Sequence, residues 1–103
     1  MRGIRLSDFE VLAISKAFRL CFLPNDHLWL FGSRIDLNKR GGDIDLYIET
    51  NINNPAEANS SKLRFLSELE SSIGEQKIDV VLKAGDVELP IYNVAKEEGI
   101  QLL

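Results

Sequence analysis

The sequence predicts an α/β (α+β) fold in which a small sheet is layered with helices. Segments with helical spacing of apolar residues alternate with short apolar or β-branched segments, an order typical of this class. A length of 103 residues allows one compact domain, which we expect to span residues 1–103. Hydrophobic residues make up 45% and charged residues 27% of the chain, as in globular proteins, so a disordered or fibrous chain is excluded.

The first helix is predicted between Ser7 and Pro24. Ser7 and Glu10 have the spacing of a capping box, and a proline ends the helical pattern. A turn at residues 24–26 then leads to residues 28–31, a short bulky run typical of a strand that is buried on both faces. The expected buried stripe of the helix consists of Phe9, Val11, Ile14, Phe18 and Cys21.

Four further elements complete the predicted order. Residues 43–49 alternate polar and apolar side chains with period two, which predicts a strand. Asn54 before Pro55 marks the start of a second helix that ends at Gly74. Residues 77–82 predict a third strand, and residues 89–98, closed by Gly99, predict a short last helix. The apolar face expected for the second helix consists of Leu63, Leu66, Leu69 and Ile73.

Charge and cysteine usage exclude several classes of function. A net charge of −4 argues against binding to the phosphate backbone of a nucleic acid, because such binding needs many Lys and Arg contacts. We therefore expect no direct nucleic-acid partner. The single Cys21 and the single His27 exclude an internal disulfide and a structural zinc site, and predict a cytoplasmic protein. Charged residues interrupt the N-terminal sequence, so we expect no signal peptide and no membrane span.

Two carboxylates on one predicted strand form a candidate metal site. Asp43 and Asp45 are two positions apart, so both side chains leave the same face, with their Cα atoms roughly 6–7 Å apart. Such carboxylates repel each other unless a cation lies between them. Mg²⁺ prefers oxygen ligands and often binds one or two carboxylates together with substrate phosphates. The pair therefore indicates magnesium, although the same pattern also occurs on the solvent face of amphipathic strands.

A candidate phosphate loop precedes this strand. Gly32 directly follows a strand and lets backbone N–H groups approach an anion, while Ser33 can cap a helical turn or bond a phosphate. Arg34 adds positive charge to the same connection. Asp79 lies in a later apolar run, where a buried charge is costly unless it is paired or metal-bound. We therefore expect three acids to converge with the glycine-serine loop.

These residues together resemble the minimal nucleotidyltransferases of the DNA polymerase β-like superfamily. The resemblance covers about residues 28–82 and implies a small mixed sheet flanked by helices. It implies catalytic and Mg²⁺-binding roles for Asp43, Asp45 and Asp79, with ATP as the nucleotide donor. Residues 32–34 would then hold the β and γ phosphates of ATP.

The resemblance extends to the nucleotidyltransferase half of two-gene toxin–antitoxin modules, whose other half is a HEPN-type ribonuclease. It implies that the protein transfers AMP from ATP to a tyrosine of that toxin and so silences it. Residues 80–103, which follow Asp79, are too few for an acceptor-binding domain, so a partner protein is expected to supply the acceptor. Two alternatives stay open: an antitoxin that acts by occlusion with a vestigial site, and an enzyme for a small hydroxylated molecule, whose pocket a homodimer could complete.

Other conspicuous side chains receive a structural interpretation. His27, next to the turn, is expected at or near the surface without a catalytic role. Trp29 and Phe31 alternate on a strand and are expected in the core rather than as a platform for base stacking. Cys21 is expected to be a small buried hydrophobic residue.

Overall fold

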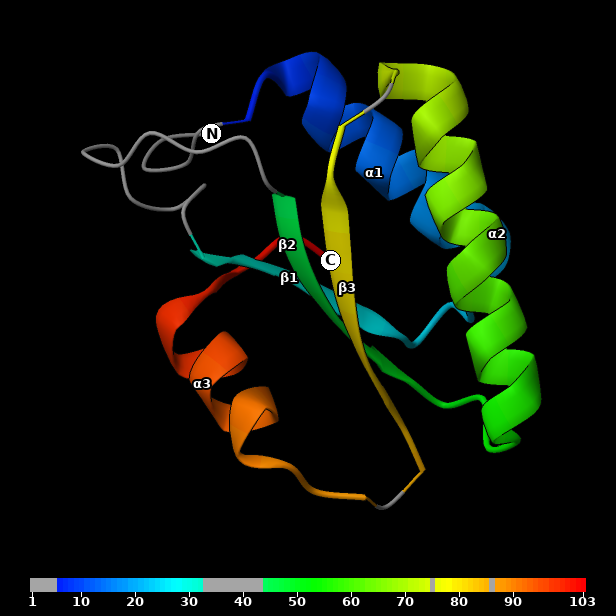
Figure 1. Cartoon of the computed structure of the whole chain (residues 1–103), viewed down its shortest axis with the longest axis vertical. Coiled ribbons are helices and arrows are strands. Elements are labelled where there is room, and N and C mark those ends of the chain that lie inside the picture. Colours follow the sequence, from blue (N-terminus) through cyan, green and yellow to red (C-terminus); the bar gives the residue numbers. More distant parts are fainter. Residues whose placement is uncertain (1–5, 33–43, 75, 86) are drawn as a thin grey trace.

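The computed structural model describes residues 6–32, 44–74, 76–85 and 87–103. They form a four-stranded sheet with α1 and α2 on one face and α3 on the other (Figure 1). This arrangement confirms the predicted α+β class. In chain order the elements are α1 (Asp8–Cys21), β1 (His27–Phe31), β2 (Ile44–Thr50), α2 (Pro55–Ile73), β3 (Ile78–Ala84), α3 (Pro90–Glu98) and β4 (Ile100–Gln101).

The sheet is mixed, with the strand order β3-β2-β1-β4. β1 runs antiparallel to both of its neighbours, whereas β2 and β3 are parallel and are connected through α2. Strand β4 was not predicted, because its two residues are too few to show an alternating pattern. It pairs Ile100 with Leu30 and Gln101 with Trp29, and thereby places the C-terminal residues along β1.

Helix α1 begins with the predicted capping box. The Ser7 hydroxyl accepts a hydrogen bond from the Glu10 amide at 3.1 Å, and the Glu10 carboxylate accepts one from the Ser7 amide at 2.9 Å. The predicted stripe is wrong at Phe9, which is 61% exposed because the face toward the sheet starts one turn later. The buried residues of α1 are Ala13, Ile14, Ala17, Phe18 and Cys21.

Helix α2 begins and ends as predicted, but its buried face differs from the predicted one. The Asn54 side chain accepts hydrogen bonds from the amides of Ala56 and Glu57, and the helix ends at Gly74. Leu63, predicted on the apolar face, is 56% exposed. The buried residues are Ala58, Phe65 and Leu69, so the buried stripe passes through Phe65 rather than Leu63.

The sheet has an apolar layer on each face. Under α1 and α2, Phe18 and Phe22 pack with Phe65, with ring centroids between 5.2 and 6.3 Å apart. Under α3, the Tyr47 ring lies between those of Trp29 and Tyr92, at centroid distances of 5.3 and 5.5 Å. The central strands therefore fill both faces, as predicted for residues 28–31.

Candidate active site

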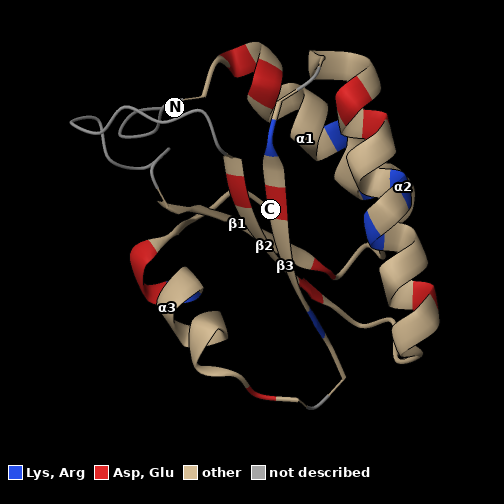
Figure 2. Cartoon of the chain, viewed as in Figure 1, with Lys and Arg blue, Asp and Glu red and all other residues tan. Residues whose placement is uncertain are grey.

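Two of the three predicted catalytic carboxylates lie side by side. In the parallel pairing of β2 and β3, Asp45 lies directly opposite Asp79, and neighbouring strands are ~4.8 Å apart (Figure 2). On the other side of β2, Asp45 is paired with Phe31 at the end of β1. Residues paired in register have side chains on the same face, which here is the face that carries α3. The fold thus brings carboxylates 34 positions apart in the sequence to one place.

Gly32 contacts the same carboxylate. It has a φ of 78°, which L-residues with side chains rarely adopt, and a Cβ atom there would lie 2.2 Å from the Asp45 Oδ2 atom. Both its backbone conformation and the space around it therefore require glycine. The end of β1 and the start of β2 are in this way packed directly against each other at Asp45.

Asp79 was predicted to be a buried charge, and this prediction is wrong, because Asp79 is exposed. β3 is an edge strand, and Asp79 points away from the face covered by α1 and α2. Its carboxylate therefore needs no partner to offset desolvation. Its position opposite Asp45, rather than its burial, makes it a candidate.

The donor set at this end of the sheet fits a hard divalent cation. Asp45 and Asp79 offer carboxylate oxygens from adjacent positions, and Mg²⁺ prefers such ligands. Within the described ranges, no group of three or more His, Cys, Asp or Glu side chains forms a complete metal site. The third predicted ligand, Asp43, lies outside the described residues, as do Ser33 and Arg34 of the predicted phosphate loop.

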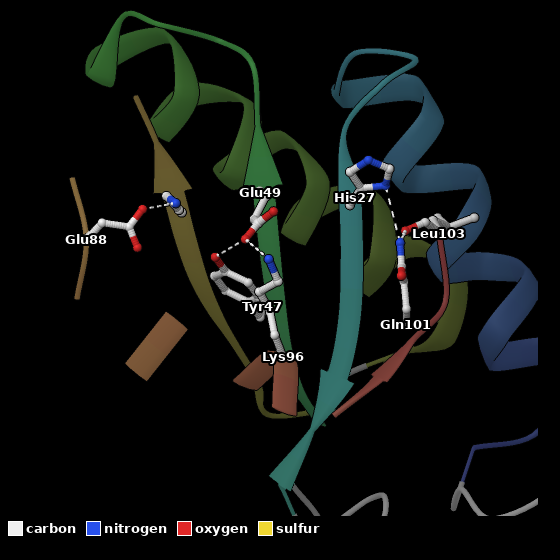
Figure 3. A network of polar contacts seen from close by, with 8 residues as sticks. His27, Tyr47, Glu49, Glu88, Lys96, Gln101 and Leu103 are labelled. Carbon is white, nitrogen blue, oxygen red and sulfur yellow. Dashed lines mark hydrogen bonds and ion pairs between the residues drawn. The ribbon is translucent and has the colours of Figure 1, made fainter. Parts of the chain in front are cut away.

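A second acid on the same face of β2 has different surroundings (Figure 3). The Glu49 carboxylate accepts a hydrogen bond from the Tyr47 hydroxyl at 2.7 Å and pairs with the Lys96 ammonium at 3.2 Å. The Lys96 ammonium also lies 5.3 Å from the centroid of the Trp29 ring. These contacts join α3 to the sheet. No pattern in the sequence predicted them.

The surroundings shift the pKa values of this pair in opposite directions. Burial, followed by the hydrogen bond to Glu49, raises the pKa of Tyr47 well above its usual value. Burial alone would raise the pKa of Glu49, but the hydrogen bonds from Tyr47 and Lys96 outweigh this effect and hold that pKa below its usual value. Near neutral pH the network therefore contains a neutral phenol and an ionised carboxylate.

Sequence reasoning also missed a structural role for Asp26, which is 4% exposed. Its carboxylate accepts hydrogen bonds from the Thr50 hydroxyl at 2.6 Å and from the amides of Asn51 and Leu23 at 2.7 and 2.9 Å. Asp26 thus joins the turn before β1 to the end of β2. The only available signal was its place in a turn, where Asp commonly bonds nearby backbone groups.

The predicted exposure of His27 and burial of Cys21 are confirmed. His27 is exposed, with its Nδ1 atom 3.3 Å from the Gln101 Nε2 atom (Figure 3), and Cys21 is buried, which raises the pKa of its thiol. His27 also lines a hollow of about 260 Å³ together with Glu49 and Lys83. This hollow lies at the end of β2 and β3 remote from Asp45 and Asp79, so it is not part of the candidate active site.

A comparison with protein families identifies the family of this chain. The family described as nucleotidyltransferase domain matches residues 14–102, and the chain belongs to that family. Its general activity is the transfer of a nucleotidyl group, and enzymes of the family generally use a nucleoside triphosphate and a divalent metal. No curated protein matches the chain significantly. In the part of the chain that the structure describes, no helix is both long and apolar enough to span a membrane.

Proposed function

We propose that this protein is a magnesium-dependent nucleotidyltransferase that uses ATP and modifies a partner protein. The observation that carries the proposal is the register of β2 and β3, which sets Asp45 opposite Asp79 next to Gly32. Family membership supports the reaction class. The assignment of Asp43 as a further ligand, and of Ser33 and Arg34 as phosphate contacts, rests on their motif positions.

The chemistry assigns a role to each carboxylate. Bound Mg²⁺ would neutralise charge on the nucleotide phosphates. In the transfer, the acceptor hydroxyl oxygen bonds to the α-phosphorus of ATP, and the bond from that phosphorus to the pyrophosphate oxygen breaks. Asp43 and Asp45 would hold the metal. Asp79 is either a further ligand or the base that takes the hydroxyl proton.

The proposed acceptor is a tyrosine of a HEPN-type toxin, with the chain as its antitoxin. The support is the resemblance of the glycine-serine and aspartate motif to that class. The net charge of −4 favours a protein over a polynucleotide, whose phosphates it would repel.

Intact-mass spectrometry tests this function. The chain is co-expressed with the product of its neighbouring gene and incubated with ATP and Mg²⁺, and the expected result is a partner heavier by one or more AMP groups on tyrosine. Asp45→Asn should abolish the mass increase, whereas Asp8→Asn, an exposed acid on α1, should preserve it. A tight complex with an unmodified partner would favour occlusion, and the absence of any complex would favour a small-molecule acceptor.

A further inference from the structure

The two edges of the sheet differ in how open they are. β4 forms one edge with two residues, whereas β3 forms the other with seven. Within the described ranges, no strand pairs with the outer side of β3. Proteins usually block such an edge with prolines, bulges, charged side chains or very short strands, and of these devices β3 has only its two charges, Asp79 and Lys83. β3 contains no proline and pairs with β2 without interruption over all seven residues, so its edge is open to a further strand.

The peptide groups on this edge can be assigned from the ladder. The Ile44 amide donates to the Lys77 carbonyl at 3.0 Å, so the alternating residues Asp79, Val81 and Lys83 also direct their peptide groups toward β2. The peptide groups of Val80 and Leu82 therefore point outward. The Tyr92 hydroxyl donates to the Leu82 carbonyl at 3.3 Å, and that carbonyl keeps a second lone pair for another donor.

The flanks of this edge are mostly apolar. A groove of about 360 Å³ runs between α2 and the segment before α3, and Leu82 and Ala84 of β3 line it together with Ala58. At its margins, Val87 is 58% exposed, and Leu63, one helical turn from the groove residue Asn59, is 56% exposed. Figure 1 looks onto this edge, with β3 drawn in front of β2 and β1.

We propose that β3 pairs in antiparallel orientation with β3 of a second copy of this chain, with Val81 opposite Val81. In this register Val80 and Leu82 face each other as hydrogen-bonded pairs, in agreement with their outward peptide groups. Asp79 then lies opposite Lys83 of the second copy, and by symmetry this ion pair occurs twice. The two ion pairs between Asp79 and Lys83 occupy non-hydrogen-bonded positions of the ladder, where facing side chains approach most closely.

Charge complementarity indicates that the strand that pairs with the open edge of β3 comes from a second copy of the chain. Asp79 and Lys83 are the charged residues of β3, and they are placed symmetrically about Val81. Within β3, pairing about any other residue does not place Asp79 opposite Lys83. Pairing about Val81 also places Lys83 of the second copy beside Asp79. Each candidate active site would then receive one cation from the other copy.

The oligomeric state of the full chain tests this surface, and the test needs neither nucleotide nor acceptor, so it is independent of the proposed function. Sedimentation equilibrium should show a concentration-dependent dimer. Lys83→Glu should raise the dimer Kd by about tenfold or more, because both cross-strand pairs become repulsive. The double variant Asp79→Lys with Lys83→Glu restores opposite charges and should recover most of the affinity.

Two controls separate pairing from folding. Lys16→Glu, on the exposed side of α1, makes the same charge change and should leave the Kd unchanged. Circular dichroism checks that each variant folds. Recovery in the double variant excludes a simple loss of the contact between Lys83 and Glu88 of the same copy, since that contact is lost in both variants.

Amide exchange measured by NMR locates the interface. The outward amides of Val80 and Leu82 should gain protection as the dimer forms, while the Val81 amide, directed toward β2, should be protected at all concentrations. A chain that is monomeric at every concentration, or a dimer indifferent to the charge reversal and its rescue, would overturn the proposal. Protection of these amides only after a different protein is added would assign the edge to that protein instead.

Discussion

Strand β2 carries two acids on one face, and the described residues beside each of them differ. Asp45 lies opposite a second carboxylate, Asp79, and against Gly32, whereas Glu49 accepts a hydrogen bond from Tyr47 and pairs with Lys96. The strand, the face and the functional group are the same, so the neighbours determine the role. A carboxylate beside a hydroxyl and an ammonium holds elements together, whereas adjacent carboxylates favour the binding of a cation.

The largest expected difference between the two acids is in activity. Asp45→Asn should reduce nucleotidyl transfer by at least about 10²-fold, because the proposed metal ligand is lost, while the protein stays folded. Glu49→Gln should leave transfer within about twofold, since Glu49 lies at the far end of the site's strand. Transfer assays on both variants, with folding checked by circular dichroism, make the comparison. Equal losses in the two variants would contradict the division of roles, and unchanged activity in folded Asp45→Asn would remove Asp45 from the site.

Glycine substitutions separate backbone strain from damage to the site. Gly32→Ala should destabilise the protein by about 1–3 kcal/mol and lower transfer at least about tenfold, because its Cβ atom would displace the Asp45 carboxylate. Gly85→Ala is the matched control: its φ is also positive, at 73°, but nothing lies within 4 Å of the added Cβ atom. It should lose similar stability and keep its transfer rate. Urea unfolding and the transfer assay distinguish these outcomes, and an equal fall in activity would attribute the effect of Gly32→Ala to strain alone.

The Glu49 network should make stability depend on acid pH. The folded-state pKa of Glu49 is lowered, so its contribution is fully present above the unfolded pKa of ~4.3 and is lost as pH falls through the folded value. Urea midpoints of the wild type should therefore drop more steeply than those of Glu49→Gln between about pH 5 and about pH 3. At neutral pH the variant should be about 1 kcal/mol less stable. Parallel pH profiles for the two proteins would contradict a stabilising role for the Glu49 charge.

The features predicted correctly from the sequence depend on short stretches of chain. The capping box of Ser7 and Glu10, the Asn54 cap and the end of α2 at Gly74 each involve residues a few positions apart. The wrong predictions concern exposure, which depends on what packs above a residue. Phe9 and Leu63 follow helical spacing yet remain outside the core, because they lie off the buried stripes of α1 and α2.

The candidate site was predictable as a set of residue types but not as an arrangement. Asp45 and Asp79 were expected to converge, yet their direct opposition follows from the register of β2 and β3, which no local pattern determines. The contacts of Asp26 with Thr50 and of Glu49 with Lys96 join distant parts of the sequence, so they could not be predicted. The roles of Asp43, Ser33 and Arg34 stay predictions from the motif.

The smallest change in stability is expected from substitution of Lys96, a partly exposed residue of α3 that contacts Glu49 and the Trp29 ring. Lys96→Ala should cost about 0.5–1 kcal/mol, because it removes an ion pair with Glu49 and a cation 5.3 Å from the Trp29 ring centroid, both partly exposed to solvent. Lys96→Met keeps most of the apolar stem and should recover the packing but not the charge. A double-mutant cycle with Glu49→Gln isolates the pair, and its coupling energy should shrink in high salt. A coupling energy of zero at low salt would show that burial of Tyr47 and Tyr92, rather than charge, holds α3 on the sheet.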